Sequence, residues 1–214
     1  MSEIIINMEA FWYKHRIMMG FDPDKPVTFL EMMYWGKIRK IREKCLNSDD
    51  PTYAITNAPY FDKQYLLEKW WDDLDDTEKR HFLKVVWQNK GSSVMYGYDW
   101  WIPFFKDVGF IKDEDVNVPT EPVVLYRGAI PDLKLGMPWS SNYDVAEAYA
   151  FHSLNLFGEK EIYKATINPE SILAIFRGDF VDQDGKPLVK GTEYVINHQM
   201  LDENTIEQIT NNSL

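Results

Sequence analysis

The sequence predicts an α+β protein, with a mainly helical N-terminal region over residues 1–112 and a strand-rich C-terminal region over residues 123–214. Three observations lead to this prediction. Apolar residues recur at helical spacing in the first half of the chain. The stretch 113–122 (DEDVNVPTEP) is acidic and carries two prolines, which is typical of a linker. Beyond it, β-branched and aromatic runs alternate with turn residues, as they do in strands.

Three helices are expected in the N-terminal region. Thr28 and Glu31 form a capping-box pattern ahead of the first, which runs to a break at 49–51 with apolar residues at helical spacing (Met32, Met33, Trp35, Ile38, Ile41). Its polar positions are basic, and are either a solvated face or a patch for an acidic partner or a nucleic acid (Lys37, Arg39, Lys40, Arg42, Lys44). A second helix is expected over 63–71. A third follows the acids of 75–78 and buries Phe82, Val85 and Val86.

Four strands are expected in the C-terminal region, at 123–126, 162–167, 172–176 and 193–196. One amphipathic helix interrupts them near 143–154, with five residues expected to face inward (Val145, Ala146, Tyr149, Ala150, Ser153).

The composition restricts the class of function. The net charge of −11 argues against a protein that coats duplex nucleic acid, because such proteins neutralise phosphates with Lys and Arg. The single cysteine, Cys45, excludes an intrachain disulfide. The N-terminus lacks the apolar run of a signal peptide, no stretch is apolar enough to span a bilayer, and the four histidines have no metal-ligand spacing. We therefore expect a cytoplasmic protein with no membrane partner and no metal.

Arg127 is the first candidate functional residue. It follows three apolar residues and precedes Gly128, which predicts the end of a buried strand. A buried guanidinium needs an anion to offset its desolvation, and its planar fork suits a phosphate or a carboxylate. Gly128 would let backbone groups approach a flat ligand. The structural alternative is an internal salt bridge from Arg127 to Glu121 or Asp132.

The second candidate block is Gly136-Met-Pro-Trp-Ser-Ser. Ser140 and the residues after it are typical of a helix N-terminus, which is the structural alternative. In a functional interpretation, the Ser140 hydroxyl fixes an arginine or a ribose by hydrogen bonding. Trp139 would offer a stacking wall for a ligand ring.

The third candidate is Glu193, on a strand that alternates with Tyr194 and Ile196 on the opposite side. A carboxylate on an apolar strand is costly without a partner. Its useful role would be to accept hydrogen bonds from ribose hydroxyls and to stabilise an oxocarbenium-like state, as carboxylates do in glycoside cleavage.

With these blocks in this order, residues 123–198 resemble the catalytic domain of an ADP-ribosyltransferase of the Arg-Ser-Glu, toxin-like branch. The resemblance implies that Arg127 binds the NAD phosphates, that a Ser-centred turn supports the site and that Glu193 is catalytic. Tyr149-Ala-Phe-His152 is similar to the aromatic-x-x-Arg segment of that family. Tyr149 would then stack on nicotinamide, and His152 would stand where an arginine contacts phosphate.

Besides His152, two further departures from the family pattern change what the resemblance implies. Pro138 stands where the first serine of the family's turn is common, so the hydroxyl is either missing or supplied by Ser140. Gly191 stands where arginine-modifying members carry Glu or Gln, which weighs against protein-arginine modification. Segment 177–192 would be the loop before Glu193 that helps to choose the acceptor.

The fold implied by the resemblance is a split β-sandwich around an NAD cleft. The implied function is mono-ADP-ribosyl transfer from NAD, as a substrate, to a macromolecular acceptor, with RNA or DNA slightly favoured over protein. The expected context is an intracellular toxin or phage-related enzyme, with an antitoxin or inhibitor protein as a further partner. The alternatives are an NAD glycohydrolase that uses water as acceptor, and a non-catalytic binding protein that keeps the fold.

Overall fold

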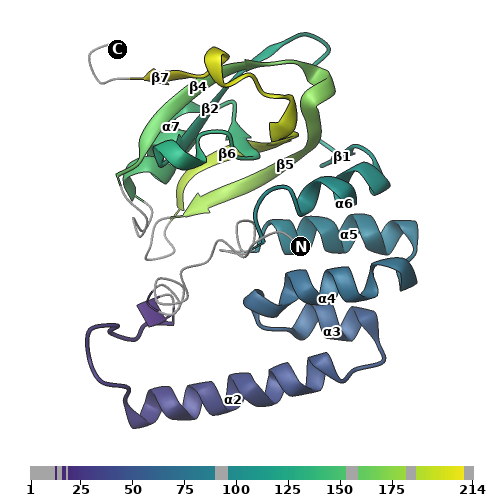
Figure 1. Cartoon of the computed structure of the whole chain (residues 1–214), viewed down its shortest axis with the longest axis vertical. Coiled ribbons are helices and arrows are strands. Elements are labelled where there is room, and N and C mark those ends of the chain that lie inside the picture. Colours follow the sequence, from purple (N-terminus) through teal and green to yellow (C-terminus); the bar gives the residue numbers. More distant parts are fainter. Residues whose placement is uncertain are drawn as a thin grey trace. The chain divides into compact units, whose positions relative to one another are not determined.

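The computed structural model describes residues 13, 16–17, 19–89, 96–152, 159–181 and 187–209. The chain divides into two compact units, Met1–Phe104 and Phe105–Leu214. The first unit is helical and the second is built around a sheet, which makes the protein α+β, as the sequence predicts (Figure 1). The division falls within helix α6 (Trp101–Val108), ahead of the segment that the sequence suggested as a linker.

The first unit is a succession of short helices in which each packs against the next. They are α2 (Phe29–Leu46), α3 (Pro51–Asn57), α4 (Lys63–Trp70) and α5 (Asp76–Trp87), with 3-10 turns at Tyr60–Asp62 and Trp71–Asp73. Side chains fix three of the starts, and at α3 the Asp50 carboxylate accepts from the Tyr53 N–H at 3.0 Å. The Thr28 hydroxyl accepts a hydrogen bond from the Glu31 N–H, and Asp75 and Glu78 form a complete capping box. The three helices predicted from the sequence are therefore confirmed.

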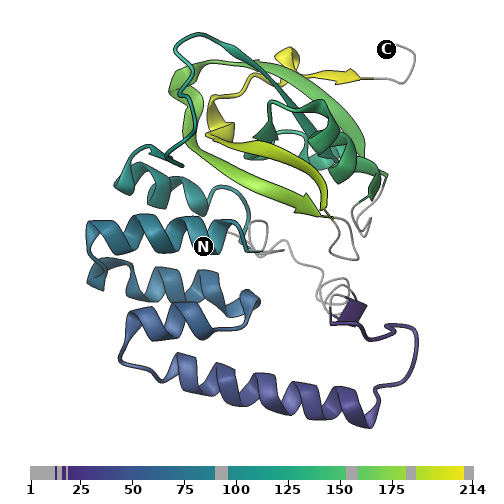
Figure 2. The same ribbon diagram turned by 180° about the vertical axis from the view of Figure 1, so that it is seen from behind.

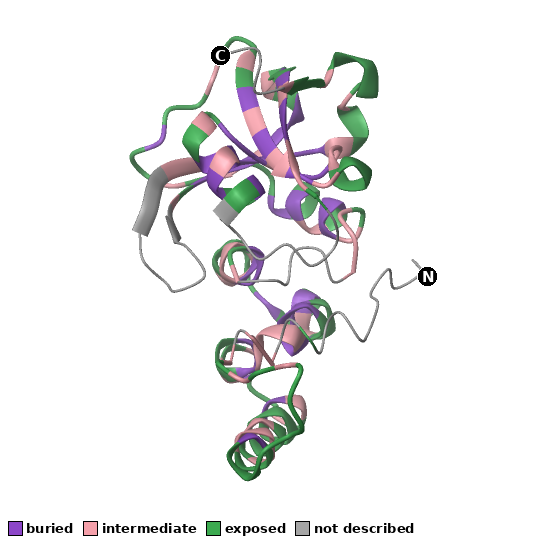
Figure 3. Cartoon of the chain, turned by 90° about the vertical axis from the view of Figure 1, so that its left-hand side faces the viewer, coloured by how far each residue is buried: buried purple, intermediate pink, exposed green. Residues whose placement is uncertain are grey.

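The side of α2 that was expected to be buried is largely exposed. Of its eighteen residues only Glu31 and Cys45 are buried, while Met32, Met33 and Ile41 are exposed. Most of α2 accordingly carries the exposed colour in Figure 3. The physical reason is that α2 packs mainly against one helix, α3, which covers only one of its sides.

The second unit contains a seven-stranded sheet with the order β1-β5-β6-β3-β2-β4-β7. Its strands are Ile111–Lys112 (β1), Val123–Ala129 (β2), Pro138–Ser140 (β3), Glu161–Ile167 (β4), Ile172–Val181 (β5), Pro187–Ile196 (β6) and Glu207–Ile209 (β7). Neighbouring strands are antiparallel, apart from the parallel pair β1 and β5. Figure 2 shows the long pair β5 and β6. These two strands include the described parts of 177–192, so this segment continues the strands where a loop was expected.

One face of the sheet carries the main core of this unit, which includes Leu125, Trp139, Tyr163, Ile175 and Tyr194. The other face is covered by α7 (Tyr143–Glu147) and a π-helical turn (Ala148–His152). Ala146 and Ala150 of these segments pack against Ile162.

The contact of this helix with the sheet depends on Gly128. A Cβ at Gly128 would lie 2.7 Å from the Ala150 backbone nitrogen and closer still to the Ala146 carbonyl oxygen. Glycine is therefore needed because the protein's own helix approaches this strand, and not because a ligand does.

Segment 113–122 belongs to the second unit and packs into its core, whereas a linker was expected here. Val116 is buried in the main core of the sheet. The Asp113 N–H donates to the Ile175 carbonyl oxygen at 3.1 Å, and the Asp113 carboxylate accepts from the Arg177 N–H at 2.9 Å. None of the helices within the described ranges combines the length and apolar character that a bilayer crossing requires.

Candidate functional site

The three sequence blocks meet on three adjacent strands of the sheet. β3, which carries Ser140, lies between β2 and β6. Ser140 is paired with Tyr126 on one side and with Glu193 on the other. Directly opposed residues of antiparallel strands have Cβ atoms about 4.5–5.5 Å apart on the same face. Ser140 and Glu193, fifty-three positions apart in the sequence, are therefore neighbours.

The alternation of side chains divides the candidate residues between the two faces of the sheet. Tyr126, Ser140 and Glu193 belong to the face that α7 covers. Arg127 follows Tyr126 and shares the opposite face with the buried Leu125 and Ala129. Arg127 and Glu193, to which the resemblance assigns phosphate binding and catalysis, therefore lie on opposite faces of the sheet.

Arg127 is buried and holds the connection between β2 and β3. Its Nε donates to the Leu133 carbonyl oxygen at 3.1 Å, and its Nη1 donates to the Pro138 carbonyl oxygen at 2.6 Å. These carbonyls belong to the segment that leads directly into Ser140. The guanidinium thus fixes the approach to the candidate site through the backbone.

Ser140 takes the first of the two roles that the sequence left open, at the start of a helix. Its buried hydroxyl oxygen accepts a hydrogen bond from the Asn142 N–H at 3.1 Å, and the Asn142 side chain caps α7 through the Asp144 N–H at 3.0 Å. The helix-start interpretation is therefore confirmed. The hydroxyl can also donate its own proton, and the residue paired with Ser140 across the strand is Glu193.

Glu193 is partly buried, between a buried phenylalanine and a pair of glycines on β5 and β6. Its partner on β5 is the fully buried Phe176. The following pair on this face is Gly178 opposite Gly191, and neither has a side chain. A Cβ added at Gly178 would meet nothing within 4 Å. The carboxylate therefore has no side chain beside it at this pair of positions on its face.

Trp139 does not form the ligand-stacking wall that was expected. Its side chain is 2% exposed within the main core, and its indole N–H donates to the Gly136 carbonyl oxygen at 2.8 Å. The strand alternation explains this, since Trp139 follows Pro138 and precedes Ser140 and therefore points to the opposite face.

Two exposed aromatic residues, Tyr149 and Phe151, lie on the π-helical turn. Tyr149 was expected to face inward, but 49% of it is exposed, so its ring is accessible to a ligand. Its carbonyl oxygen accepts from Lys160 Nζ at 3.0 Å. π-Helical turns are rare and are frequent at functional sites. The side chain of His152, and residues 153 and 154 of the expected helix, lie outside the described part of the chain.

Sequence reasoning missed three residues around this face. Phe151 stands within the recognised aromatic segment, but its exposure carries no sequence signal. Lys160 is separated from Tyr149 in the sequence and meets it only through folding. Tyr143 packs against Tyr126, and the pKa of its hydroxyl is raised by burial first and by Glu147 and Asp144 next.

Within the described ranges, no group of three or more His, Cys, Asp or Glu side chains is arranged to hold a metal ion. Comparison of the chain with protein-family models, with curated proteins and with solved structures gives no match.

Proposed function

We propose that this chain is a mono-ADP-ribosyltransferase that moves ADP-ribose from NAD to a macromolecular acceptor. The observation that carries the proposal is the pairing of Ser140 with Glu193 on one face of the sheet, beside the Gly178–Gly191 pair, which has no side chains. The resemblance of the sequence blocks to Arg-Ser-Glu transferases supplies the reaction, and the adjacency of their strands supports it. The finer fold, a split β-sandwich around an NAD cleft, is part of this proposal.

In the proposed reaction, the bond between nicotinamide and the ribose C1′ breaks and nicotinamide leaves as a neutral molecule. The Glu193 carboxylate accepts hydrogen bonds from the ribose hydroxyls and stabilises the positive charge that develops at the ring. The Ser140 hydroxyl donates a hydrogen bond that orients this carboxylate. The acceptor nucleophile then forms a bond to C1′ and loses its proton.

The remaining candidates take roles that follow from their surroundings. The exposed ring of Tyr149 is the proposed stacking surface for nicotinamide. Arg127 becomes a positioning residue, because its hydrogen bonds to the Leu133 and Pro138 carbonyl oxygens hold the backbone that leads into Ser140. A phosphate contact from Arg127 or His152 is implied by the resemblance alone.

The acceptor is proposed to be a nucleic acid, with a protein as second choice, because Gly191 replaces the acidic or amide side chain of arginine-modifying relatives. An intracellular toxin or phage-related role is part of the same analogy. The lack of side chains at the Gly178–Gly191 pair beside Glu193 favours a second candidate, an NAD glycohydrolase, with water as the acceptor.

The test is nicotinamide release from NAD by the full chain, compared between the native protein and Glu193→Gln. Glu207→Gln is a matched control, because Glu207 lies in the same row of the sheet, where it pairs with Lys164 at 3.0 Å. We expect Glu193→Gln to lower kcat by about 100-fold or more while the Kd for NAD changes little. Glu207→Gln should leave kcat within about twofold. Unchanged release by Glu193→Gln would overturn the proposal.

A further inference from the structure

One side of helix α2 is an exposed stripe with an unusual composition. Seven residues recur along it at helical spacing, and all are exposed (Phe29, Leu30, Met33, Lys37, Lys40, Ile41, Lys44). Phe29 and Leu30 are 71% and 75% exposed, and Met33 is 57% exposed. Single exposed apolar residues are ordinary, but a contiguous group of large ones marks an interaction surface.

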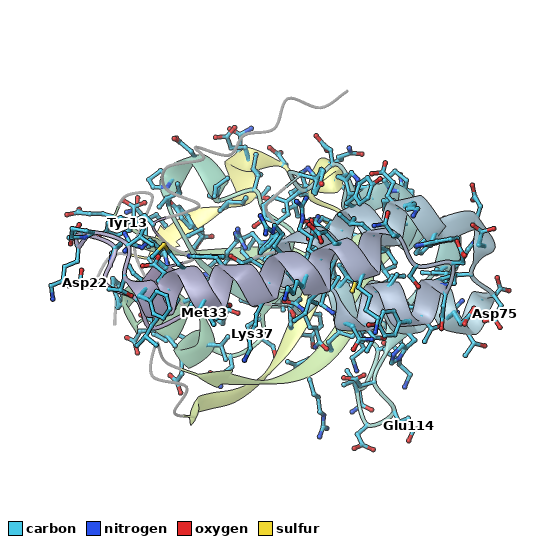
Figure 4. All side chains as sticks on the ribbon, turned by 90° about the horizontal axis from the view of Figure 1, so that it is seen from below. Tyr13, Asp22, Met33, Lys37, Asp75 and Glu114 are labelled. Atoms are coloured by element: carbon cyan, nitrogen blue, oxygen red, sulfur yellow. The ribbon has the colours of Figure 1, made fainter. Side chains whose placement is uncertain are left out.

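The stripe has two chemically distinct halves. Its first two turns are apolar, with Val27 and Met32 exposed beside Phe29, Leu30 and Met33. Its second half carries three lysines, Lys37, Lys40 and Lys44. Figure 4 shows Met33 and Lys37, at the junction of the halves, on the same side of the helix.

The opposite side of α2 is anchored, so the stripe belongs to a fixed helix. Glu31 is buried and forms an ion pair with Arg16 at 2.7 Å. Arg42 pairs with the buried Asp62 at 2.8 Å, and Cys45 is buried. Two ion pairs and a buried cysteine, spread along the helix, therefore fix which side faces outward.

A second copy of this chain does not suit the stripe. In an antiparallel pair of α2 helices, the lysines of one copy would lie over Leu30 and Phe29 of the other. In a parallel pair, the lysines would face lysines, and like charges at close range are destabilising. Like charges therefore oppose the parallel pair, and in the antiparallel pair the lysines find no carboxylates on the stripe.

A nucleic acid suits only half of the stripe. Phosphates would satisfy the lysines, but the aliphatic side chains of Leu30 and Met33 would remain uncovered. Base stacking needs aromatic rings, and Phe29 is the one aromatic residue among the seven.

We infer that α2 is a docking surface for a partner protein that presents an acidic amphipathic segment. Apolar side chains of that segment cover Phe29, Leu30 and Met33, and its carboxylates face Lys37, Lys40 and Lys44. This is the mode in which amphipathic helices dock on partners, with apolar anchors giving affinity and charge giving orientation and specificity. The inference does not depend on the proposed enzymatic activity.

The test measures fluorescence anisotropy of labelled synthetic helical peptides with the full chain. Each of two acidic peptides has leucines on one face of one half and glutamates on the same face of the other half. The leucines lie in the N-terminal half of one peptide and in the C-terminal half of the other. Matched peptides carry lysines in place of the glutamates. We expect at least one acidic peptide to bind about tenfold or more tightly than its lysine counterpart, with affinity that falls as salt rises.

Three variants locate the binding. The double variant Leu30→Ser with Met33→Ser should lower the affinity for the acidic peptide at least about tenfold, because the apolar anchors are lost. Lys37→Glu with Lys40→Glu should reverse the preference toward the lysine peptide. Arg39→Gln is the control, because Arg39 lies off the stripe and pairs with Glu43. All these positions are exposed, so folding should be retained, and circular dichroism checks this.

The inference is overturned if acidic and lysine peptides bind equally, or if the charge reversal leaves the preference unchanged. Two further outcomes would replace it. A single-stranded oligonucleotide that displaces the acidic peptide would make α2 a nucleic-acid surface. A concentration-dependent dimer in sedimentation, lost on Leu30→Ser with Met33→Ser, would make the occupant a second copy.

Discussion

Ser140 in β3 stands directly opposite Glu193 in β6, and both side chains leave the sheet on the face that α7 covers. Ser140 therefore has two neighbours of different kinds. Its oxygen accepts a hydrogen bond from the Asn142 N–H at the start of α7, and the carboxylate lies across the strand. This arrangement couples the start of a helix to the position of the one candidate catalytic group.

Replacing Ser140 by Ala tests this coupling. We expect a loss of about 1 kcal/mol in the free energy of unfolding, because the Asn142 N–H loses its acceptor. We also expect nicotinamide release to fall at least about tenfold, because the hydroxyl beside Glu193 is gone. Ser141→Ala is the control, since Ser141 is exposed and should change neither quantity. Equal effects from both substitutions would contradict the proposed role of Ser140 beside Glu193.

A methyl group at Gly128 should separate the helix from the sheet. The added Cβ would overlap the Ala146 carbonyl oxygen and crowd the Ala150 nitrogen, both of which are backbone atoms that cannot rotate away. Gly128→Ala should therefore lower the free energy of unfolding by about 1–3 kcal/mol or more, measured in urea. Gly178→Ala, where the Cβ meets nothing within 4 Å, should change it by less than about 1 kcal/mol. A tolerated Gly128→Ala would contradict the close packing.

Arg127→Lys distinguishes a positioning residue from a direct phosphate ligand. Lysine keeps the charge but cannot reproduce two donors in one plane, so at least one carbonyl of the 133–138 segment should lose its partner. We expect a loss of about 1–3 kcal/mol in the free energy of unfolding even without NAD. Arg177→Lys, at an exposed position, is the control. A weaker Kd for NAD with unchanged stability would instead indicate a ligand contact.

The helix starts and most strands were predictable because they depend on local chemistry. Thr28 does accept from the Glu31 N–H, and the strand patterns at 123–126 and 162–167 correspond to β2 and β4. Helices α3 and α6 were missed. Pro51, taken to end a helix, is also a favourable first residue of the next one.

The candidate site was only partly predictable, because its face assignments depend on long-range pairing. Nothing near Trp139 in the sequence indicates that it joins the core while Ser140 faces α7. That division follows from the registers of β3 with β2 and β6. The sequence alternatives for Arg127 were an anion or a salt bridge to Glu121 or Asp132, and they did not anticipate its backbone partners, the carbonyl oxygens of Leu133 and Pro138.

The stability of the first unit should depend on pH through Glu31. Hydrogen bonds from the Arg16 guanidinium, first among the causes, hold the pKa of the Glu31 carboxyl below its usual range. Because the pKa of Glu31 is lower in the folded state, the stabilisation is present above the unfolded-state pKa of about 4.3. It is lost as the pH falls through the folded-state pKa. Glu31→Gln should therefore lower Tm most at neutral pH, with the difference from the native protein narrowing toward pH 3.

The control for this prediction is Glu43→Gln, an exposed carboxylate on the same helix. Its Tm should follow that of the native protein across the whole pH range. A difference between Glu31→Gln and the native protein that stayed constant with pH would show that the Arg16–Glu31 ion pair is not responsible.

The central claim, that Glu193 supports transfer of ADP-ribose, is tested most directly by following the adenine-labelled half of NAD. The full chain and Glu193→Gln are each incubated with labelled NAD and a total cell lysate, which is then separated into protein and nucleic-acid fractions. We predict label in one macromolecular fraction, favouring nucleic acid, and its loss with Glu193→Gln. Free ADP-ribose and nicotinamide without labelled macromolecules would indicate a glycohydrolase, and label that persists with Glu193→Gln, or no turnover of NAD by either protein, would contradict the account.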